Sequence, residues 1–340
     1  MINIGVVGVG GWGKNLARNY YQIPESNLKY ICDLDEKKLE QAKAQYPGTV
    51  MTKDFDELLN DPDLNAVVIA TTAPGHFPLG KAALEAGKDV YIEKPLVLTV
   101  EEAEALIKCA EEHGRILMVG HLLEYHPVVN YLKDIIQKGE LGDIHYIYAQ
   151  RVNLGTVRGD ENALWNFAPH DISVILYLLG KEPTDVSARG QAYLQKDKDI
   201  EDVVFLSLNF NGESMAHVHV SWLDPHKIRK ITVVGSKKMA VFDDLEGNEK
   251  LRLYDKGAKY SEDYDSFAEY IGLRFGDITI PHIQVGEPLR LECNHFLECI
   301  RERKQPLSDG YDGLRVVKVL DAAQNSLKKN GVPIDIKSIS

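Results

Sequence analysis

Cysteine is scarce in this chain, with four residues among 340, and the four are widely spaced. They are Cys32, Cys109, Cys293 and Cys299. Thiols so few and scattered exclude a disulfide framework in a protein of this size, and we expect them to be reduced. Cys293, His295 and Cys299 suggest a partial metal site, but they lie in the helix-like run Pro288–Glu302. The two cysteines align poorly on one helical face and no fourth ligand is evident, so we predict no metal.

The chain also lacks an excess of basic residues. Lys and Arg number 39 against 51 Asp and Glu, which gives a formal net charge of −12. That charge repels phosphates at long range, so we expect neither nucleic acid nor a membrane as a partner. The opening Met1-Ile2-Asn3-Ile4 runs straight into an apolar strand pattern, without the segments of a signal peptide or a membrane span. Cytoplasmic localisation is the resulting expectation.

No internal repeat or low-complexity linker divides the chain, yet 340 residues predict about two domains. The first part alternates short apolar runs with amphipathic helical segments, which is typical of a parallel, doubly wound α/β sheet. The expected buried strands are Ile2–Val7, Leu28–Cys32, Ala66–Ala70, Asp89–Ile92 and Ile116–Gly120. Right-handed connections would place the helices on both faces of this sheet.

From about Gly142 the pattern changes to longer strands with period-two alternation, which predicts an α+β domain with a mainly antiparallel sheet. The expected strands are Ile144–Arg151, Val186–Tyr193, Val203–Asn209, Met215–Ser221, Ile228–Val234 and Lys250–Tyr254, and the expected helices are Ala168–Leu179 and Gly313–Lys329. We predict domains at residues 1–121 and 122–340, with the C-terminal helix able to pack back on the first domain and a small-molecule cleft between the two. The segment Tyr254–Tyr270 is predicted to be an irregular, solvated loop.

A glycine motif directly follows the first expected strand. Gly8-Val9-Gly10-Gly11-Trp12-Gly13 fits the pattern G-x-G-x-x-G and opens a helical segment. Gly8 would allow a tight turn, Gly10 would let the backbone approach a pyrophosphate, and Gly13 would let the helix pack closely on the strand. The N–H groups of the helix N-terminus would face the negative charge. Because glycines also serve ordinary turns, the motif needs support from a second feature.

Asp33 supplies that support. It stands twenty residues beyond Gly13 at the end of the second expected strand, where a carboxylate accepts hydrogen bonds from the adenosine ribose hydroxyls. The same carboxylate would repel the 2′-phosphate of NADP, and Leu34-Asp35-Glu36 adds further acid. The order of strand, turn, helix, strand and acid therefore predicts a Rossmann domain that binds NAD. Lys37 and Lys38 lie close by in the sequence, and we expect them in a solvated first helical turn.

A candidate chemical residue follows the strand Asp89–Ile92. Glu93-Lys94-Pro95 places a lysine at the carboxyl end of the parallel sheet, where ligands of such folds bind. Pro95 restricts Lys94 to an extended conformation and permits a cis peptide bond, which would hold the ammonium group in place. The alternative reading of this tripeptide is a surface lysine before a turn.

Together these features resemble the Gfo/Idh/MocA family of oxidoreductases, whose glycine motif, acidic residue, Thr71-Thr72-Ala73-Pro74-Gly75-His76 turn and Glu93-Lys94-Pro95 motif occur here in order. The resemblance implies a C-terminal domain whose open sheet forms a homodimer or homotetramer, and hydride transfer between a nicotinamide and a sugar or polyol carbon. It implies that Lys94 contacts the reacting hydroxyl. The implied cofactor contacts are Gly8, Gly10, Gly11, Trp12, Gly13, Asp33, Thr71, Thr72, His76, Glu93, Lys94 and His121.

A second family element has the pattern Asp-x-x-x-His, and Asn166-Phe167-Ala168-Pro169-His170 occupies it. His170 matches, and an imidazole suits a reaction that releases a proton at neutral pH. Asn166 departs from the family aspartate: it could orient the ring but supplies no negative charge. Asp171 is a possible substitute, although adjacent helical residues point about 100° apart. Lys94 stays as the alternative proton carrier.

The stretch Arg151–Arg158, followed by Asn162 and Trp165–Ile172, looks like the nucleotide-sugar branch of the family. That branch includes UDP-N-acetylglucosamine 3-dehydrogenases and UDP-N-acetylglucosaminuronate dehydrogenases. Arg158 could pair with a diphosphate, and Trp165 could stack on a sugar or ring. The expected substrate contacts are Asn153, Arg158, Trp165, Asn166 and Tyr125. We expect His121, Glu124, Tyr125 and His126, just past the last Rossmann strand, to line the same cleft.

The leading hypothesis is therefore NAD-dependent oxidation of a ring hydroxyl at C3 of a UDP-linked N-acetylhexose or its uronate, with Lys94 and His170 at the reacting oxygen. A free sugar or inositol dehydrogenase is the first alternative. A non-catalytic NAD or sugar-nucleotide sensor is the alternative from another class, and the presence of both Lys94 and His170 argues against it. Glycoside hydrolysis through transient oxidation by NAD also fits the fold.

Overall fold

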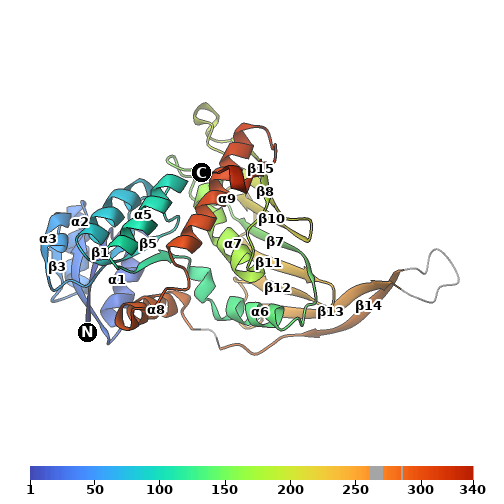
Figure 1. The fold of residues 1–340 in the computed structure, drawn as a ribbon, viewed down its shortest axis with the longest axis horizontal. Helices are drawn as coiled ribbons and strands as arrows, with labels where there is room; N and C mark the ends of the chain where they lie inside the picture. The colour runs from blue at the N-terminus through green and yellow to red at the C-terminus, as the bar shows by residue number, and fades with distance from the viewer. Residues whose placement is uncertain (261–270, 285, 340) are drawn as a thin grey trace. The chain divides into compact units, whose positions relative to one another are not determined.

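The computed structural model of the protein describes residues 1–260, 271–284 and 286–339, and it contains two sheets (Figure 1). The first has six strands in the order β3-β2-β1-β4-β5-β6, and every neighbouring pair is parallel. Its strands are β1 (Ile2–Val7), β2 (Ser26–Cys32), β3 (Val50–Thr52), β4 (Ala66–Ile69), β5 (Asp89–Glu93) and β6 (Leu117–Gly120). The five strands expected from the sequence are confirmed, and β3 is an addition. β3 is only three residues long and partly exposed, too short for a hydrophobic pattern to reveal.

The strand order of this sheet reverses direction between β1 and β4, which is where ligands bind in doubly wound folds. Right-handed connections on either side of the reversal put the helices on both faces. These helices are α1 (Gly13–Gln22), α2 (Glu36–Gln45), α3 (Phe55–Asn60), α4 (His76–Glu85) and α5 (Val100–Glu112). The glycine turn between β1 and α1 thus opens at the carboxyl edge of the sheet, together with the ends of β2, β4 and β5.

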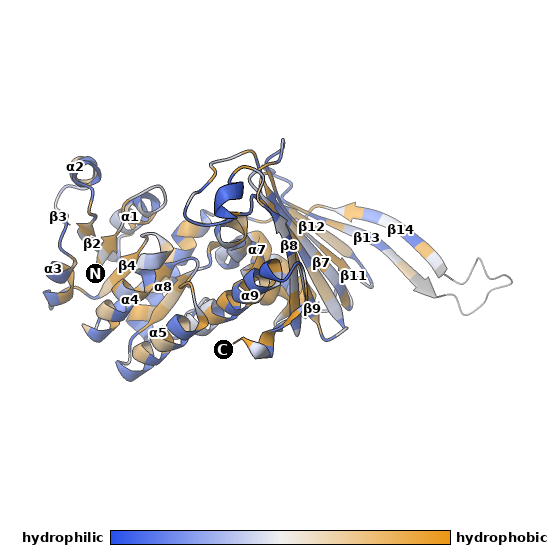
Figure 2. Cartoon of the chain, turned by 90° about the horizontal axis from the view of Figure 1, so that it is seen from above, coloured by the Kyte–Doolittle hydropathy of each residue, from blue (hydrophilic) through white to orange (hydrophobic). Residues whose placement is uncertain are grey.

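The second sheet has nine strands in the order β14-β13-β12-β11-β7-β10-β9-β8-β15. All its pairs are antiparallel except β7 with β10, so the prediction of a mainly antiparallel sheet is confirmed. Its strands are β7 (Ile144–Val152), β8 (Asp185–Gln191), β9 (Val203–Phe210), β10 (Ser214–Ser221), β11 (Ile228–Gly235), β12 (Met239–Asp243), β13 (Leu251–Tyr260), β14 (Ile271–Thr279) and β15 (Ile334–Asp335). Hydrophobic and hydrophilic residues alternate along β14 (Figure 2), as expected for a strand with two different faces.

The prediction of an irregular loop at Tyr254–Tyr270 is wrong for its first part, because residues up to Tyr260 belong to β13. Residues 261–270 lie outside the described residues. The polar composition of residues 255–260 shows no hydrophobic alternation, although these residues pair antiparallel with the next strand, β14.

Helix α7 (Ala163–Leu179) packs on β7, β9 and β10 and carries the second predicted chemical residue (Figure 1). The sequence predicted its start at Ala168, because a proline is favoured in a first helical turn. The helix instead begins one and a half turns earlier, where Asn162 caps it by accepting the N–H of Trp165. Pro169 therefore lies inside the helix.

The described residues divide into two compact units that do not follow chain order. The first contains Met1–Tyr125 and Gly286–Lys318, and thus includes α8 (Pro288–Glu302) beside α1. The second contains residues 126–284, with the gap at 261–270, and Val319–Ile339; it includes α6 (Pro127–Gln137). Helix α9 (Gly310–Lys328) contributes to both. Within the described part of the chain, none of the helices has the length and apolarity needed to cross a membrane.

The core of the first unit shows why α8 belongs there. Phe296 of α8 is fully buried, and its ring meets that of Tyr91 of β5 edge-on, with centroids 5.9 Å apart. Leu289, Cys293 and Leu297 of the same helix join the hydrophobic cluster built from β1, β2 and α1. Burying such side chains stabilises a fold by about 1.5–3 kcal/mol each. A helix that begins 168 residues after the last Rossmann strand therefore closes the first core.

Candidate active site

The glycines of the turn between β1 and α1 divide into two that the fold requires and two that face open space. Gly8 has a φ of +86°, and a Cβ there would lie 2.8 Å from the carbonyl oxygen of Ala70; a Cβ on Gly13 would lie 1.8 Å from the carbonyl oxygen of Gly8. The fold itself therefore requires glycine at both positions. A Cβ on Gly10 or Gly11 would meet no protein atom within 4 Å. Open space before these two residues, at the start of α1, is the cradle that a dinucleotide pyrophosphate fits.

Asp33 holds this turn from the end of β2. Its Oδ2 accepts the N–H of Val9 at 2.8 Å and its Oδ1 accepts the N–H of Asp35 at 2.9 Å. The side chain keeps only 9% of its surface exposed, and Lys38 Nζ lies 3.6 Å from Oδ1. The expectation that Lys38 belongs only to a solvated turn is thus incomplete, because its ammonium group pairs with the carboxylate predicted to select the cofactor.

Replacing Asp33 with serine is expected to shift cofactor preference toward NADP. The substitution removes the negative charge that repels a 2′-phosphate and leaves Lys38 nearby, but it also removes the acceptor of the Val9 N–H. We expect the Kd for NAD to rise about tenfold and the Kd for NADP to fall, in line with about 1.5–3 kcal/mol for hydrogen bonds to charged groups. Calorimetric titration with both cofactors measures this. The exposed Asp63→Ser is the control, and unchanged relative affinities in D33S would contradict the role of Asp33.

His76 lies at the start of α4, just after the Thr71-Thr72 turn, and only 1% of its surface is exposed. Its Nδ1 lies 2.8 Å from the carbonyl oxygen of Pro95 and its Nε2 lies 3.2 Å from that of Thr71. Burial lowers the pKa of His76. The residue predicted as a cofactor contact thus joins the two loops that follow β4 and β5.

Glu93 links the glycine turn to the predicted catalytic lysine. Its Oε1 accepts the indole N–H of Trp12 at 2.6 Å and the hydroxyl of Tyr91 at 3.1 Å, and its Oε2 accepts the N–H of Lys94 at 3.2 Å. Burial raises the pKa of Glu93, opposed by the charge of Lys94. The peptide bond between Lys94 and Pro95 is cis, as the sequence allowed. Trp12, Glu93 and Lys94 were predicted separately as cofactor contacts, and the structure brings them together.

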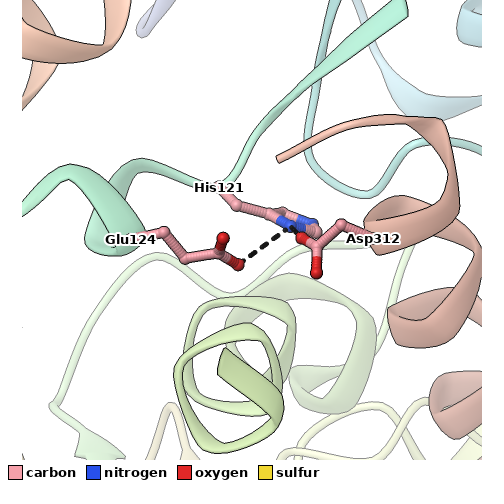
Figure 3. A group of neighbouring side chains, drawn as sticks. All are labelled: His121, Glu124 and Asp312. Atoms are coloured by element: carbon pink, nitrogen blue, oxygen red, sulfur yellow. Dashed lines mark hydrogen bonds and ion pairs between the residues drawn. The ribbon is translucent and has the colours of Figure 1, made fainter. Parts of the chain in front are cut away.

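His121 lies in a buried cluster after β6 rather than on an open surface (Figure 3). Its Nδ1 lies 2.6 Å from Oδ2 of Asp312 in α9 and 3.4 Å from Oε1 of Glu124. Burial alone would lower the pKa of His121, but hydrogen bonds to the two carboxyl groups outweigh it and raise the pKa to about 10. Burial raises the pKa of Glu124 to about 8, whereas the pKa of Asp312 is lowered by His121. These directions favour a protonated His121 imidazole beside the Asp312 carboxylate.

This cluster brings three possible metal ligand atoms within 4.8 Å of one another. The hydrogen bonds of His121 account for their approach, and we assign no ion to them. The sequence singled out His121 and Glu124 but missed Asp312, which is 191 residues from His121. No sequence signal connects them, because the contact depends on where α9 begins.

In the second unit, both polar atoms of the Asn166 side chain, one helical turn before His170, form hydrogen bonds within the protein. Its Nδ2 donates to Glu161 at 2.6 Å, and its Oδ1 accepts the indole N–H of Trp222 at 3.2 Å. Asp171, considered as a substitute for the family aspartate, is fully buried and bound by Arg151 through two hydrogen bonds of 2.7 and 2.9 Å. Its charge is therefore balanced by that arginine.

Two predicted substrate contacts have partners within the protein. Tyr125 is 6% exposed, and its hydroxyl lies 2.8 Å from Ser308 Oγ in the first unit. Trp165 donates its indole N–H to Gln324 at 3.1 Å in the second unit. His126, expected beside them in a cleft, is 2% exposed and caps α6 by accepting the N–H of Val128. The structure places these side chains in internal hydrogen-bond networks.

The other three predicted substrate contacts line one pocket of about 620 Å³ beside α7 in the second unit. Its lining is Asn153, Leu154, Thr156, Arg158, Asn166, Phe167, Pro225, Lys227 and Arg229. The pocket brings together three cationic side chains and two amides, a composition suited to an anionic and polar ligand. Sequence reasoning missed Lys227 and Arg229. Their only signal was the basic run Lys227-Ile228-Arg229-Lys230, which resembles any solvated strand start.

This fold and these motifs define an oxidoreductase with a NAD-binding Rossmann domain. Residues 2–121 match the oxidoreductase family with a NAD-binding Rossmann fold, and residues 129–241 match the GFO/IDH/MocA C-terminal domain. The chain therefore belongs to the Gfo/Idh/MocA family, which confirms the resemblance drawn from its motifs.

Among the relatives that match nearly the whole chain, two have an assigned substrate that bears on this protein. One is UDP-N-acetylglucosamine 3-dehydrogenase of Acidithiobacillus ferrooxidans, 29% identical over 92% of this chain and 93% of the relative. Its solved structure covers 96% of this chain and 98% of its own, with a TM-score of 0.79 and 26% identity. The other is scyllo-inositol 2-dehydrogenase (NAD(+)) of Bacillus subtilis, 28% identical over 98% of this chain and 96% of the relative.

Proposed function

We propose that the protein is a NAD-dependent dehydrogenase that oxidises the C3 ring hydroxyl of a UDP-linked N-acetylhexose or of its uronate. The observation that carries this proposal is the cationic pocket beside α7, which contains Asn153, Arg158 and Asn166. Neutral sugars and inositols have no negative charge to match such a lining, whereas a nucleotide sugar has two phosphates. Similarity to a UDP-N-acetylglucosamine 3-dehydrogenase supports the same substrate class.

Oxidation of the hydroxyl to a ketone removes a hydride from the ring carbon and a proton from the oxygen, and each needs its own acceptor. NAD held by the Gly8–Gly13 turn and Asp33 would supply a nicotinamide able to accept a hydride. Lys94, at the end of β5, donates a hydrogen bond from its ammonium group to the reacting hydroxyl oxygen and stabilises the negative charge that develops there. His170 accepts the hydroxyl proton as general base. Asn166 contributes no charge to this step, because its amide is neutral and bound to Glu161 and Trp222.

Titration of the NAD-loaded protein with UDP-N-acetylglucosamine, its uronate, UDP and myo-inositol tests the proposal, with NADH absorbance followed in parallel. We expect UDP to bind and one of the two nucleotide sugars to produce NADH. Turnover of inositol without UDP binding would contradict the nucleotide-sugar substrate.

An inositol dehydrogenase is the second candidate. Similarity to scyllo-inositol 2-dehydrogenase favours it, because the identity is nearly the same and extends over slightly more of the chain. Lys94 and His170 would act in the same way on a polyol hydroxyl. The charge of the pocket argues for the nucleotide sugar, and the titration above separates the two.

We also propose that the protein forms a homodimer or homotetramer through the face of the large sheet opposite α7. Tyr146, Phe205 and Met215 on that face are 42%, 45% and 51% exposed, while the alternate residues of the same strands are buried. Met215 is paired with Tyr146, and Phe205 stacks on His219 with ring centroids 4.4 Å apart. Exposed apolar patches of this kind mark protein interfaces.

The double variant Phe205→Asp, Met215→Asp is expected to be monomeric, because it places negative charges opposite each other across the interface. Light scattering coupled to size-exclusion chromatography measures the mass. Leu34→Asp, a mostly exposed residue of the first unit, is the matched control and should keep the parent mass. A double variant with the parent mass would place the interface elsewhere.

A further inference from the structure

The pocket beside α7 contains an arginine that forms no ion pair with a carboxylate in the described part of the chain. Arg229 is half-buried in β11. Its Nη1 donates to the carbonyl oxygens of Val152 and Ile228 at 2.9 and 2.8 Å, and its Nη2 donates to Asn153 Oδ1 at 2.6 Å. None of these acceptors is charged. The guanidinium is therefore held in place without being neutralised.

The surroundings of Arg229 increase the need for a negative partner. The ring of Phe167 lies 5.0 Å from its Cζ. Two carboxylates lie near enough to act on Arg229, and neither forms an ion pair with it: Asp171 is bound through both oxygens by Arg151, and Asp244 lies 3.7 Å from Lys250 Nζ. Burial, followed by the charge of Arg151, lowers the pKa of Arg229 to about 10, so the group is still a cation at neutral pH. A cation removed from water without a counter-charge destabilises a fold unless a ligand supplies the charge.

The pocket offers donors for such a ligand. A guanidinium has five N–H groups, and the contacts above use three, which leaves the Nε–H and one Nη2–H of Arg229 without an acceptor in the described part of the chain. Lys227 lines the same pocket, is exposed, and has no carboxylate partner within the described residues. Arg158 differs, since Asp160 and Glu161 each bind it at 2.9 Å.

We propose that Arg229 and Lys227, rather than Arg158, form an oxyanion-binding site that holds the charged group of the substrate. This inference rests on the proposed function and names the residues that recognise the substrate's charge. Two sources supply the same chemistry: the diphosphate of a nucleotide sugar and the carboxylate of a uronate. Asn153 acts as a positioning residue, because its hydrogen bond orients the guanidinium plane.

The test is calorimetric titration of the NAD-loaded, full-length protein with UDP, glucuronic acid and neutral N-acetylglucosamine. We expect Arg229→Gln to raise the Kd for the bound anion about 30-fold or more, since it removes a charge-assisted donor pair worth about 2 kcal/mol or more. Lys227→Gln should raise it about three- to tenfold, and Arg158→Gln less than either. Arg229→Lys keeps a cation without the planar donors, and we expect a loss of about tenfold.

Lys230→Gln is the matched control, because Lys230 is paired with Asp243 at 3.1 Å and does not line the pocket. The circular dichroism spectrum and thermal unfolding midpoint of every variant report whether the protein is folded. If Arg229→Gln does not fold, the anion affinities of Lys227→Gln, at an exposed residue, and of Arg229→Lys, which keeps the charge, test the inference instead.

The two anions separate the two sources. Binding of UDP that depends on Arg229 and Lys227 assigns the site to a diphosphate. Binding of glucuronic acid alone, with the same dependence, supports the oxyanion site but overturns the nucleotide part of the proposed function. The inference itself is overturned if Arg158→Gln weakens anion binding more than Arg229→Gln does, or if the parent protein binds neither anion. An intact anion site with no sugar oxidised would overturn only the proposed dehydrogenase activity.

Discussion

Lys94→Met is expected to reduce turnover by at least about a thousandfold while leaving the Kd for NAD within about threefold of the parent value. Methionine matches the length of the lysine side chain but donates no hydrogen bond, so the charge that develops on the reacting oxygen loses its stabilisation. Removing one such donor typically costs about a hundred- to a thousandfold in rate, and loss of the full charge adds to this. Initial rates of NADH formation and calorimetric NAD binding measure the two quantities.

The matched control for this experiment is Lys43→Met, which makes the same change at an exposed residue of α2 and should keep the parent rate. A change in the pH profile would show whether Lys94 also carries the proton. If the profile of residual activity keeps the limb assigned to the general base, His170 is the base; if that limb disappears with Lys94, the proton passes through the lysine. Parent turnover in Lys94→Met would contradict the proposed mechanism.

Asp312→Asn is expected to destabilise the protein by about 3–5 kcal/mol, because it leaves the His121 imidazolium buried without its nearest negative partner. Asparagine has nearly the same shape as aspartate, so packing changes little. The free energy of unfolding from urea titration measures the loss. Glu104→Gln, the same loss of charge at an exposed residue of α5 in the same unit, should leave that free energy within about 0.5 kcal/mol.

The same cluster predicts how stability depends on pH. The pKa of His121 is raised from 6.5 to about 10 and that of Glu124 from 4.5 to about 8, so both groups bind protons more tightly in the folded state. Their contributions are complete below the unfolded values and are lost as the pH rises through the folded values. Unfolding free energy should therefore fall from about pH 4.5 to 8 through Glu124 and from about pH 6.5 to 10 through His121. Asp312→Asn should flatten this dependence; the same slope in variant and parent would place its origin elsewhere.

The hydrophobic patterns of the sequence predicted most of the fold because they are local. Buried strands of four to seven residues, such as β1 and β4, appear as continuous apolar runs, and the turn at Gly8–Gly13 is required by backbone geometry that only glycine satisfies. The first half of β13 was predicted at Lys250–Tyr254, where Leu251 and Leu253 are buried, but its second half was missed because residues 255–260 are mostly polar. The start of α7 was missed because a proline inside a helix has the same local appearance as a proline at its first turn.

The sequence predicted only part of the site, because some of its contacts join residues far apart in the chain. Residue type and order predicted Gly10, Asp33, Glu93, Lys94 and His170 as cofactor and chemical residues, since each follows a strand end or matches a spaced motif. The contact between Trp12 and Glu93 and the role of Asp312 are long-range, at separations of 81 and 191 residues. The sequence predicted Arg158 as a substrate contact because it lies in a loop. In the structure Arg158 is paired with two carboxylates, whereas Arg229 forms no ion pair, and only the neighbours of each side chain distinguish the two.

By itself the sequence determined the Rossmann domain, the NAD cofactor and the family, because those depend on glycine stereochemistry and on motifs that are short and contiguous. Only the tertiary structure decided which carboxylates are already bound by arginines, which histidine is a buried cation, and which arginine is left for a ligand. Charge compensation depends on distances of a few ångströms between residues far apart in the chain, and no local pattern records those distances.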